Sequence, residues 1–127
     1  SGTDQKVKGL IREFLNDLKD QASCVEVIEE INKNHSDSTR AMLVASCWQS
    51  GLDYSGFVSD FAELFVSGDF ATAIECFTVI ESSSGHLTKA EKAALVGQLK
   101  KNASGVSGEK TALAMELLYF LEQTDED

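Results

Sequence analysis

Residues 53–82 decide the fold of this chain, and they read DYSGFVSDFAELFVSGDFATAIECFTVIES. Apolar residues recur at helical spacing on both sides of one short break. The first stripe contains Tyr54, Phe57, Val58, Phe61, Leu64 and Phe65, and the second contains Phe70, Ala73, Ile74, Phe77 and Ile80. Gly68 is placed to end the first helix and Asp69 to cap the second. Because so short a link allows only a reversal of direction, the pattern predicts two antiparallel neighbouring helices.

The same pattern of stripes and breaks continues in both directions from this segment. Further helical stripes cover 4–19, 23–34, 37–50, 88–101 and 108–123. Grouped by the breaks, the helices fall into pairs over 23–50, 53–82 and 88–122, each roughly 30 residues long, which is close to the repeat length of helical solenoids. The sequence therefore predicts an all-α protein of six to seven antiparallel helices.

Helix start and stop signals support these boundaries. Two residue pairs match the capping-box pattern of a helix start, Ser23 with Glu26 and Thr88 with Glu91. Asp37 and Asp53 are expected to open the third and fourth helices, and Gly51 to end the third in the left-handed conformation. The chain contains no proline, a residue that costs roughly 3 kcal/mol inside a helix.

The length of 127 residues is that of one domain with its own hydrophobic core. We expect a single helical domain over 3–123. The acidic end at 124–127 is expected to fray, and Ser1-Gly2 is expected to be a cloning scar.

In each predicted pair the second helix is apolar on more sides than the first, which is typical of a stack in which the second helices are sandwiched. The segment Asp37-Ser38-Thr39-Arg40-Ala41, followed by Val44-Ala45, resembles the start of the second helix in HEAT and armadillo-type repeats. The resemblance implies helical hairpins stacked into an α-α superhelix and a protein-binding role, without catalytic residues. An irregular helical bundle is the alternative fold.

The charge of the chain narrows its possible partners. With 21 acidic and 11 basic residues, the formal net charge is −10. Such a surface repels phosphate groups, so we expect neither nucleic acid nor anionic membrane as a partner. The three cysteines, Cys24, Cys47 and Cys76, are odd in number and widely spaced within apolar stretches, which favours buried thiols in a reducing compartment, the cytoplasm.

No motif in the sequence indicates catalysis. His35-Ser36-Asp37 contains the letters of a catalytic triad, but adjacent residues on one loop point in different directions. No Cys-x-x-Cys, His-x-x-x-His or Glu-x-x-His spacing indicates a metal site, and no glycine-rich phosphate loop is present. The sequence therefore predicts a non-enzymatic protein without a cofactor or a metal.

Four large side chains are candidates for contact with a partner protein: Trp48, Tyr54, Met115 and Tyr119. For Trp48 and Tyr54 the other interpretation is that they belong to the core between the first two helix pairs. The helix over 108–123 is apolar on most sides, whereas a terminal repeat should keep a polar outer face. Either the helix over 4–19 folds back over it, or it meets another chain. We favour another chain or a continuing helical array, with self-association through this C-terminal helix as one form of such a contact.

Two functions fit these observations. The first is a helical-repeat interaction or scaffold module that binds another protein. The alternative is a small ligand-binding protein or enzyme with an apolar pocket between helices, in which Tyr54, Tyr119 or His86 would supply the polar groups.

Overall fold

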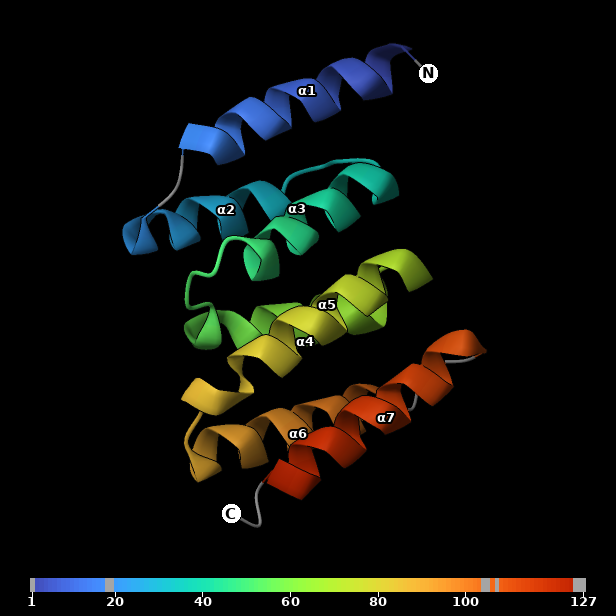
Figure 1. Ribbon diagram of the computed structural model, residues 1–127. Coiled ribbons are helices and arrows are strands. Elements are labelled where there is room, and N and C mark those ends of the chain that lie inside the picture. Colours follow the sequence, from blue (N-terminus) through green and yellow to red (C-terminus); the bar gives the residue numbers. More distant parts are fainter. Residues whose placement is uncertain (1, 18–19, 104–105, 107, 125–127) are drawn as a thin grey trace.

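The computed structural model describes residues 2–17, 20–103, 106 and 108–124. Within these residues it contains seven α-helices and no strand (Figure 1). The helices are α1 (Gly2–Asp17), α2 (Cys24–Ile31), α3 (Asp37–Gln49), α4 (Val58–Ser67), α5 (Phe70–Ser83), α6 (Lys89–Ala103) and α7 (Glu109–Thr124). Short 3₁₀ turns lie at Gln21–Ser23, Ser55–Phe57 and Ser84–His86. The predicted all-α class with six to seven helices is confirmed.

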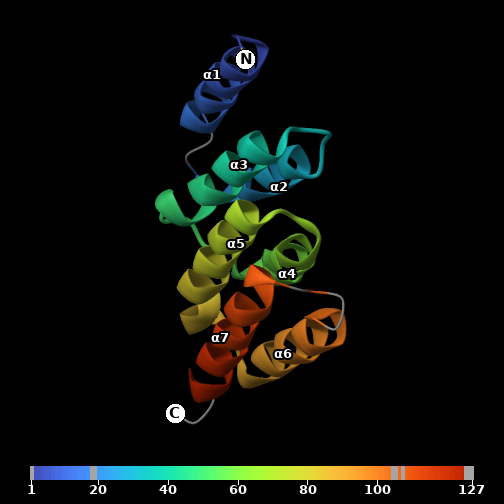
Figure 2. The same ribbon diagram turned by 90° about the vertical axis from the view of Figure 1, so that its right-hand side faces the viewer.

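The helices form antiparallel pairs arranged in two layers. The members of each pair contact each other, α2 with α3, α4 with α5, and α6 with α7. Along the stack, α3 contacts α5, α5 contacts α7, and α4 contacts α6 (Figures 1 and 2). The helices α3, α5 and α7 therefore form one layer and run in one direction, while α2, α4 and α6 form the other and run in the opposite direction. Helix α1 packs on α3 at one end of the stack, and α7 lies at the other end (Figure 1).

Helix α5 occupies the centre of the stack, where it contacts α3, α4 and α7. Its Ala73, Cys76 and Ile80 side chains are fully buried, as are Phe61 and Phe65 on α4. A helix that is covered on three sides needs apolar residues on more than one face, which explains the broad apolar surface of this segment.

The turn between α4 and α5 depends on glycine. The backbone N–H of Gly68 donates to the carbonyl oxygen of Leu64 at 2.8 Å. A Cβ atom on Gly68 would lie 2.8 Å from that same oxygen and 3.0 Å from Cγ2 of Thr72, so a larger residue does not fit without a shift of the backbone. The Asp69 carboxylate accepts a hydrogen bond from the backbone N–H of Thr72 at 2.9 Å. The predicted helix end at Gly68 and cap at Asp69 are both confirmed.

Other predicted signals are confirmed at α6 and at the end of α3. The backbone N–H of Glu91 donates to Oγ1 of Thr88 at 3.1 Å, and the N–H of Thr88 donates to the Glu91 carboxylate at 2.9 Å. These two bonds form the expected capping box. Gly51 has φ of 76°, in the left-handed region that the sequence predicted for it.

Two predicted capping residues are wrong although the helices begin close to the predicted positions, and the predicted start of the fourth helix is too early. At the first pair the backbone N–H of Ser23 donates to the Asp20 carboxylate at 3.1 Å, so Asp20 caps the 3₁₀ turn that leads into α2, while Ser23, directly before α2, makes no side-chain cap bond. At α3 the cap is Ser36, whose backbone is extended and whose Oγ accepts from Thr39 N–H, while Asp37 is already helical. The Asp53 carboxylate accepts from the N–H of Ser55, the first residue of the 3₁₀ turn Ser55–Phe57, and α4 begins only at Val58.

The predicted ends of the chain fall partly outside the described residues. Helix α1 covers Gly2–Asp17 where 4–19 was predicted, and 18–19 lie outside the described part. The same holds for 125–127 in the predicted acidic end. Among the described residues, none of the helices has both the length and the apolar character required to cross a membrane.

Arg40, from the motif that resembles a HEAT repeat, closes the end of α2. Its guanidinium group donates to the carbonyl oxygens of Ile31 at 3.3 Å and Lys33 at 3.2 Å. These carbonyls lie at the C-terminal end of α2, where intrahelical donors are lacking and the helix dipole favours a positive charge. Arg40 therefore ties the first helix of this pair to the second.

Substitution of Asp69 by alanine is expected to lower the free energy of unfolding by about 1 kcal/mol, because the N–H of Thr72 loses its acceptor. The matched variant Asp69→Asn keeps a side-chain oxygen at the cap and is expected to retain most of the stability. Urea unfolding at neutral pH, followed by circular dichroism, measures the difference. Equal stability of the two variants would contradict the capping role.

The stability of this cap also depends on pH. Hydrogen bonds from Thr72 hold the pKa of the Asp69 carboxyl below its ordinary value. A carboxylate with a depressed folded pKa stabilises the protein above its unfolded pKa, and this contribution is lost as the pH falls through the folded pKa. The advantage of the wild type over Asp69→Asn should therefore decrease below about pH 4.

Candidate protein-interaction surface

The structure exposes three of the four predicted contact residues. The exposed fractions are 39% for Trp48, 66% for Met115 and 67% for Tyr119, whereas Tyr54 is only 3% exposed. Trp48 lies near the C-terminal end of α3, and the other two exposed residues lie on α7. The candidates therefore belong to different places on the surface.

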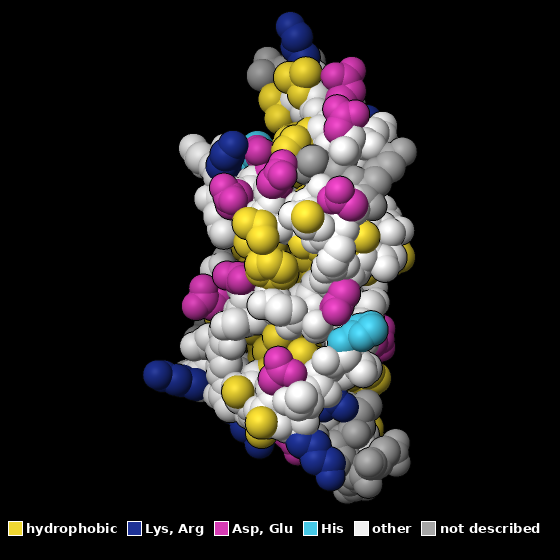
Figure 3. Space-filling view, turned by 90° about the vertical axis from the view of Figure 1, so that its left-hand side faces the viewer, with side chains coloured by type: hydrophobic (Ala, Val, Ile, Leu, Met, Phe, Trp, Pro, Cys, Tyr) yellow, Lys and Arg dark blue, Asp and Glu magenta, His cyan; other side chains and the backbone are white. Residues whose placement is uncertain are grey.

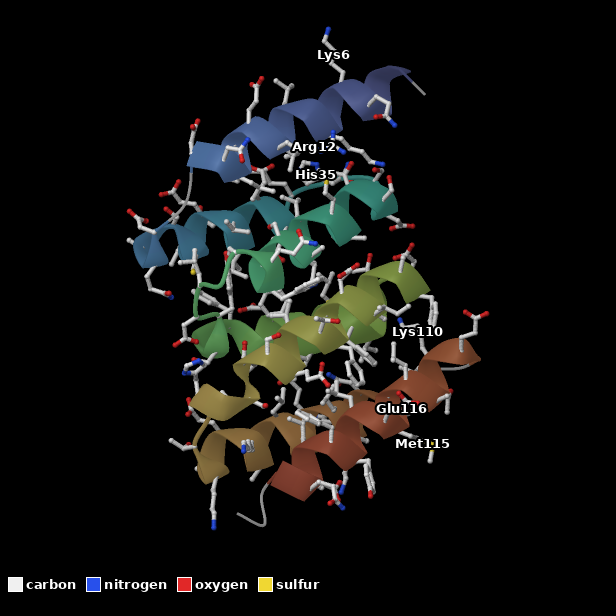
Figure 4. All side chains as sticks on the ribbon, in the orientation of Figure 1. Lys6, Arg12, His35, Lys110, Met115 and Glu116 are labelled. Carbon is white, nitrogen blue, oxygen red and sulfur yellow. The ribbon has the colours of Figure 1, made fainter. Side chains whose placement is uncertain are left out.

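Met115 and Tyr119 lie one turn apart on the same face of α7. The buried side of this helix carries Ala114, Leu117 and Leu121, and it faces α5 and α6. Figure 4 shows Met115 pointing away from the stack, whereas Lys110 points toward it. We call the surface formed by Met115 and Tyr119 the end face of α7.

Nothing in the described part of the chain covers this end face. Helix α1 lies at the opposite end of the stack, so a fold-back of the N-terminal helix over α7 does not occur (Figure 1). An exposed ion pair between Lys100 on α6 and Glu122 on α7, 3.3 Å long, joins the two helices of the terminal pair. The terminal pair thus combines a charged link between its helices with two large exposed apolar side chains.

Lys110 anchors the start of α7 to the preceding pair. Its ammonium group donates to the carbonyl oxygen of Gly68 at 2.6 Å and also to that of Val66. Partial burial lowers the pKa of Lys110, although nearby Cys76 and Asp69 act in the opposite direction. The end of α4 therefore gains a positive charge at its carbonyl groups, where the helix dipole favours one.

A second feature of the surface is a cleft of about 310 Å³ beside Trp48. The C-terminal ends of α3 and α5 form its walls, together with the loop at 51–54 and the residue Gln21. The indole Nε1–H of Trp48 donates to the carboxylate of Glu75 on α5 at 2.8 Å, which fixes the ring across the two helices. His86, Ser82 and Ser83 complete the lining, so the cleft is polar as well as apolar.

The loop at one side of the cleft is held by a pair of hydrogen bonds. The amide of Gln21 donates to the carbonyl oxygen of Asp53 at 2.6 Å, and Asp53 N–H donates to Oε1 of Gln21 at 2.9 Å. The Asp53 carboxylate accepts from Ser55 N–H at 2.8 Å. Hydrogen bonding to Ser55 lowers the pKa of Asp53, with a further contribution from His86, so this wall carries a negative charge at neutral pH.

Tyr54 belongs to the core, which corrects its prediction as a surface contact. Its ring packs edge-on against Phe61, with 6.0 Å between ring centres. Burial raises the pKa of the Tyr54 hydroxyl, and the neighbouring thiols of Cys47 and Cys24 act in the same direction. Tyr54 lies three and seven residues before Phe57 and Phe61, so the helical stripe already carried the signal for burial.

The three cysteines are buried and free. Burial raises the pKa of Cys47 to about 12 and also raises the pKa of Cys24 and Cys76. Thiols with raised pKa values are poor nucleophiles. Among the described residues, no group of three histidine, cysteine or acidic side chains could hold a metal ion.

His35 takes part in an ion-pair cluster and does not form a triad with its sequence neighbours. Its Nε2 lies 2.8 Å from the carboxylate of Glu30, which also pairs with Lys33 at 3.2 Å. Partial burial would raise the pKa of Glu30, but the hydrogen bonds from His35 and Lys33 outweigh it and the pKa is lowered. This cluster links the end of α2 to the turn that follows it.

No known protein family, curated protein or solved structure matches this chain.

The two tyrosines provide a matched test of burial. Tyr54→Ala is expected to lower the free energy of unfolding by roughly 3 kcal/mol or more, because it leaves a cavity against Phe61. Tyr119→Ala removes the same atoms from an exposed site and is expected to change the free energy of unfolding by less than about 0.5 kcal/mol. Denaturant unfolding of both variants checks the assignment. A comparable loss at the two sites would contradict it.

The thiols provide a second test. In the folded protein Cys24, Cys47 and Cys76 are expected to react with a disulfide reagent at mildly alkaline pH much more slowly than in denaturant, where all three should react at once. Absorbance of the released thiolate measures the rate. A native thiol that reacts as fast as free cysteine would show that the core is open at that position.

Proposed function

We propose that this chain is a non-enzymatic helical-repeat module that binds another protein through the end face of α7. The observation that supports this proposal is the exposure of Met115 and Tyr119 by about two thirds each, on a helix whose opposite side, with Ala114, Leu117 and Leu121, is buried against α5 and α6. Large apolar and aromatic side chains of this kind are enriched among the residues that dominate binding energy.

The repeat character of the module is part of the proposal. Three helix pairs follow one another in the same order and in the same two layers. The Asp37-Ser38-Thr39-Arg40-Ala41 segment resembles a HEAT repeat, and its Arg40 links α2 to α3. We infer a HEAT-like stack whose terminal pair offers the kind of surface on which a further pair would pack. A partner protein can use the same surface.

The absence of catalysis is supported by the roles of the charged groups. The two aspartates with lowered pKa values, Asp53 and Asp69, both hold backbone N–H groups at the start of helical segments. The thiols lie in the core with raised pKa values. Each of these shifts therefore has a structural cause. The free thiols also favour a reducing compartment such as the cytoplasm, and the charge of −10 disfavours nucleic acid and anionic membranes as partners.

A ligand-binding or enzymatic role is the second candidate, and the cleft beside Trp48 is the observation that favours it. Tyr54 and His86, two of the three polar residues predicted for such a pocket, line this cleft, whereas Tyr119 lies on α7. The cleft is at the small end of the volumes usual for small-molecule sites. An increase in melting temperature with a small molecule, lost on substitution of cleft residues, would favour this candidate over the first.

Site-specific photo-crosslinking tests the protein-binding proposal. A photoreactive phenylalanine analogue at position 119 is expected to form an adduct with one defined protein in an extract of the native source. The same analogue at position 10, where Leu10 is 61% exposed at the other end of the stack, is the control and should not form this adduct. The same adducts at both positions, or none at 119, would contradict the proposal.

The double variant Met115→Ser/Tyr119→Ser connects the adduct to the end face. It is expected to weaken binding of the captured protein by a factor of ten or more, since each anchor typically contributes over 1 kcal/mol. Its unfolding midpoint should stay close to that of the wild type. Sedimentation velocity of the purified chain over a concentration series shows whether the partner is a second copy. If the double variant bound the captured protein with unchanged affinity, the partner would bind at another surface and the role of the end face would be contradicted.

A further inference from the structure

The cleft beside Trp48 lies on the side of the molecule where the helices of one layer end. Because α3 and α5 run in the same direction, their C-terminal ends meet at this cleft, which is lined by Cys47, Trp48, Val79 and Ser83 from the last turns of the two helices. The Ser50 and Ser84 hydroxyls donate to the carbonyl oxygens of Cys47 and Glu81, and each helix end also carries the negative end of its helix dipole. Two such ends therefore favour a positive charge in the same small space.

Carboxylates add to this negative potential. Asp53 lines the cleft, and Glu75 holds the indole of Trp48 at 2.8 Å. Figure 3 shows this side of the molecule with acidic side chains across its middle and lysine and arginine side chains toward its two ends. His86 is the one side chain in the lining that can carry a positive charge. The balance around the cleft is therefore acidic, in keeping with the net charge of −10.

The aromatic ring defines which cation suits the cleft. Trp48 is 39% exposed, and its ring is fixed through Glu75, so it offers a stationary indole surface to a ligand. A cation over an indole ring is attracted by the ring electrons, and a planar guanidinium group also stacks on it. The hydroxyl groups of Ser82 and Ser83, the Asp53 carboxylate and nearby carbonyl oxygens can accept hydrogen bonds from such a group.

We propose that the cleft beside Trp48 binds an arginine side chain from an exposed segment of a partner protein. The guanidinium group stacks on the indole ring and donates to the acceptors at the ends of α3 and α5. The cleft of about 310 Å³ holds one such group with its first methylene groups. This site is distinct from the end face of α7, and the proposal does not depend on the function proposed for that face.

Trp48 is the only tryptophan in the chain, so its indole N–H gives a single NMR signal from the site itself. Titration of the purified protein with N-acetyl-arginine amide at constant ionic strength is expected to shift this signal saturably, in the millimolar range. N-acetyl-citrulline amide, which has the same shape without the charge, should leave it in place. N-acetyl-lysine amide should bind more weakly than the arginine compound, because its ammonium group does not stack.

Charge-neutralising variants connect the signal to the cleft. Glu75→Gln keeps an acceptor for the indole N–H, and Asp53→Asn keeps an acceptor for Ser55. Each is expected to weaken binding of the arginine compound roughly threefold to tenfold. The control Glu116→Gln removes the same charge from α7, far from the cleft, and should not change the affinity (Figure 4). The Met115→Ser/Tyr119→Ser variant should also bind normally, which separates this test from that of the end face.

Three outcomes would overturn the proposal. The first is no saturable shift with the arginine compound up to tens of millimolar. The second is an equal shift with the citrulline compound, which would make the cleft a site for neutral groups. The third is a saturable shift with inorganic phosphate, which would show that His86 and the backbone make it an anion site.

Discussion

The packing of α5 between its neighbours is the constraint on which the rest of the structure depends. This helix contacts α3 and α7 within its own layer and α4 in the other layer. Its Ala73, Cys76 and Ile80 side chains are fully buried, so each neighbour gains an apolar surface from it. The turn at Gly68 and Asp69 sets how α4 and α5 meet. Without that tight reversal, the pairs on either side would have no common helix on which to stack.

The two proposed binding sites result from this same arrangement. Because the helices of one layer run in one direction, the C-terminal ends of α3 and α5 lie next to each other and enclose the cleft beside Trp48. Within the described part of the chain, α7 has a neighbouring helix on one side only, and Met115 and Tyr119 lie on its other, exposed side. The cleft beside Trp48 thus results from two parallel neighbouring helices within a layer, and the end face of α7 results from the position of that helix at the end of the described stack. A partner could engage either site without displacing the other.

Much of the fold could be predicted from the sequence because its signals are local. Helical stripes, the Gly68-Asp69 turn and the Thr88–Glu91 capping box each involve residues within one or two turns of one another. Positions that depend on contacts between distant segments were missed. Gln21 holds the loop at Asp53, which is 32 residues away, and no sequence pattern predicts this contact. The cleft itself is made from three separate segments, at 21, 47–54 and 79–86, so only the stacking of the pairs reveals it. For Tyr54 the two sequence signals disagree. Its position in the apolar stripe indicates burial, whereas its residue type is typical of contacts with a partner protein.

Helix α1 is held by fewer contacts with neighbouring helices than α5 is. It packs on α3 at one end of the stack, and Leu10 on its outer side is 61% exposed. In linear repeat arrays, each unit is stabilised mainly by its nearest neighbours. Detachment of α1 therefore breaks one helix–helix interface, whereas opening of α5 breaks three. Amide hydrogen exchange should consequently be graded along the molecule, with α1 opening by local unfolding long before the global transition and α5 exchanging last.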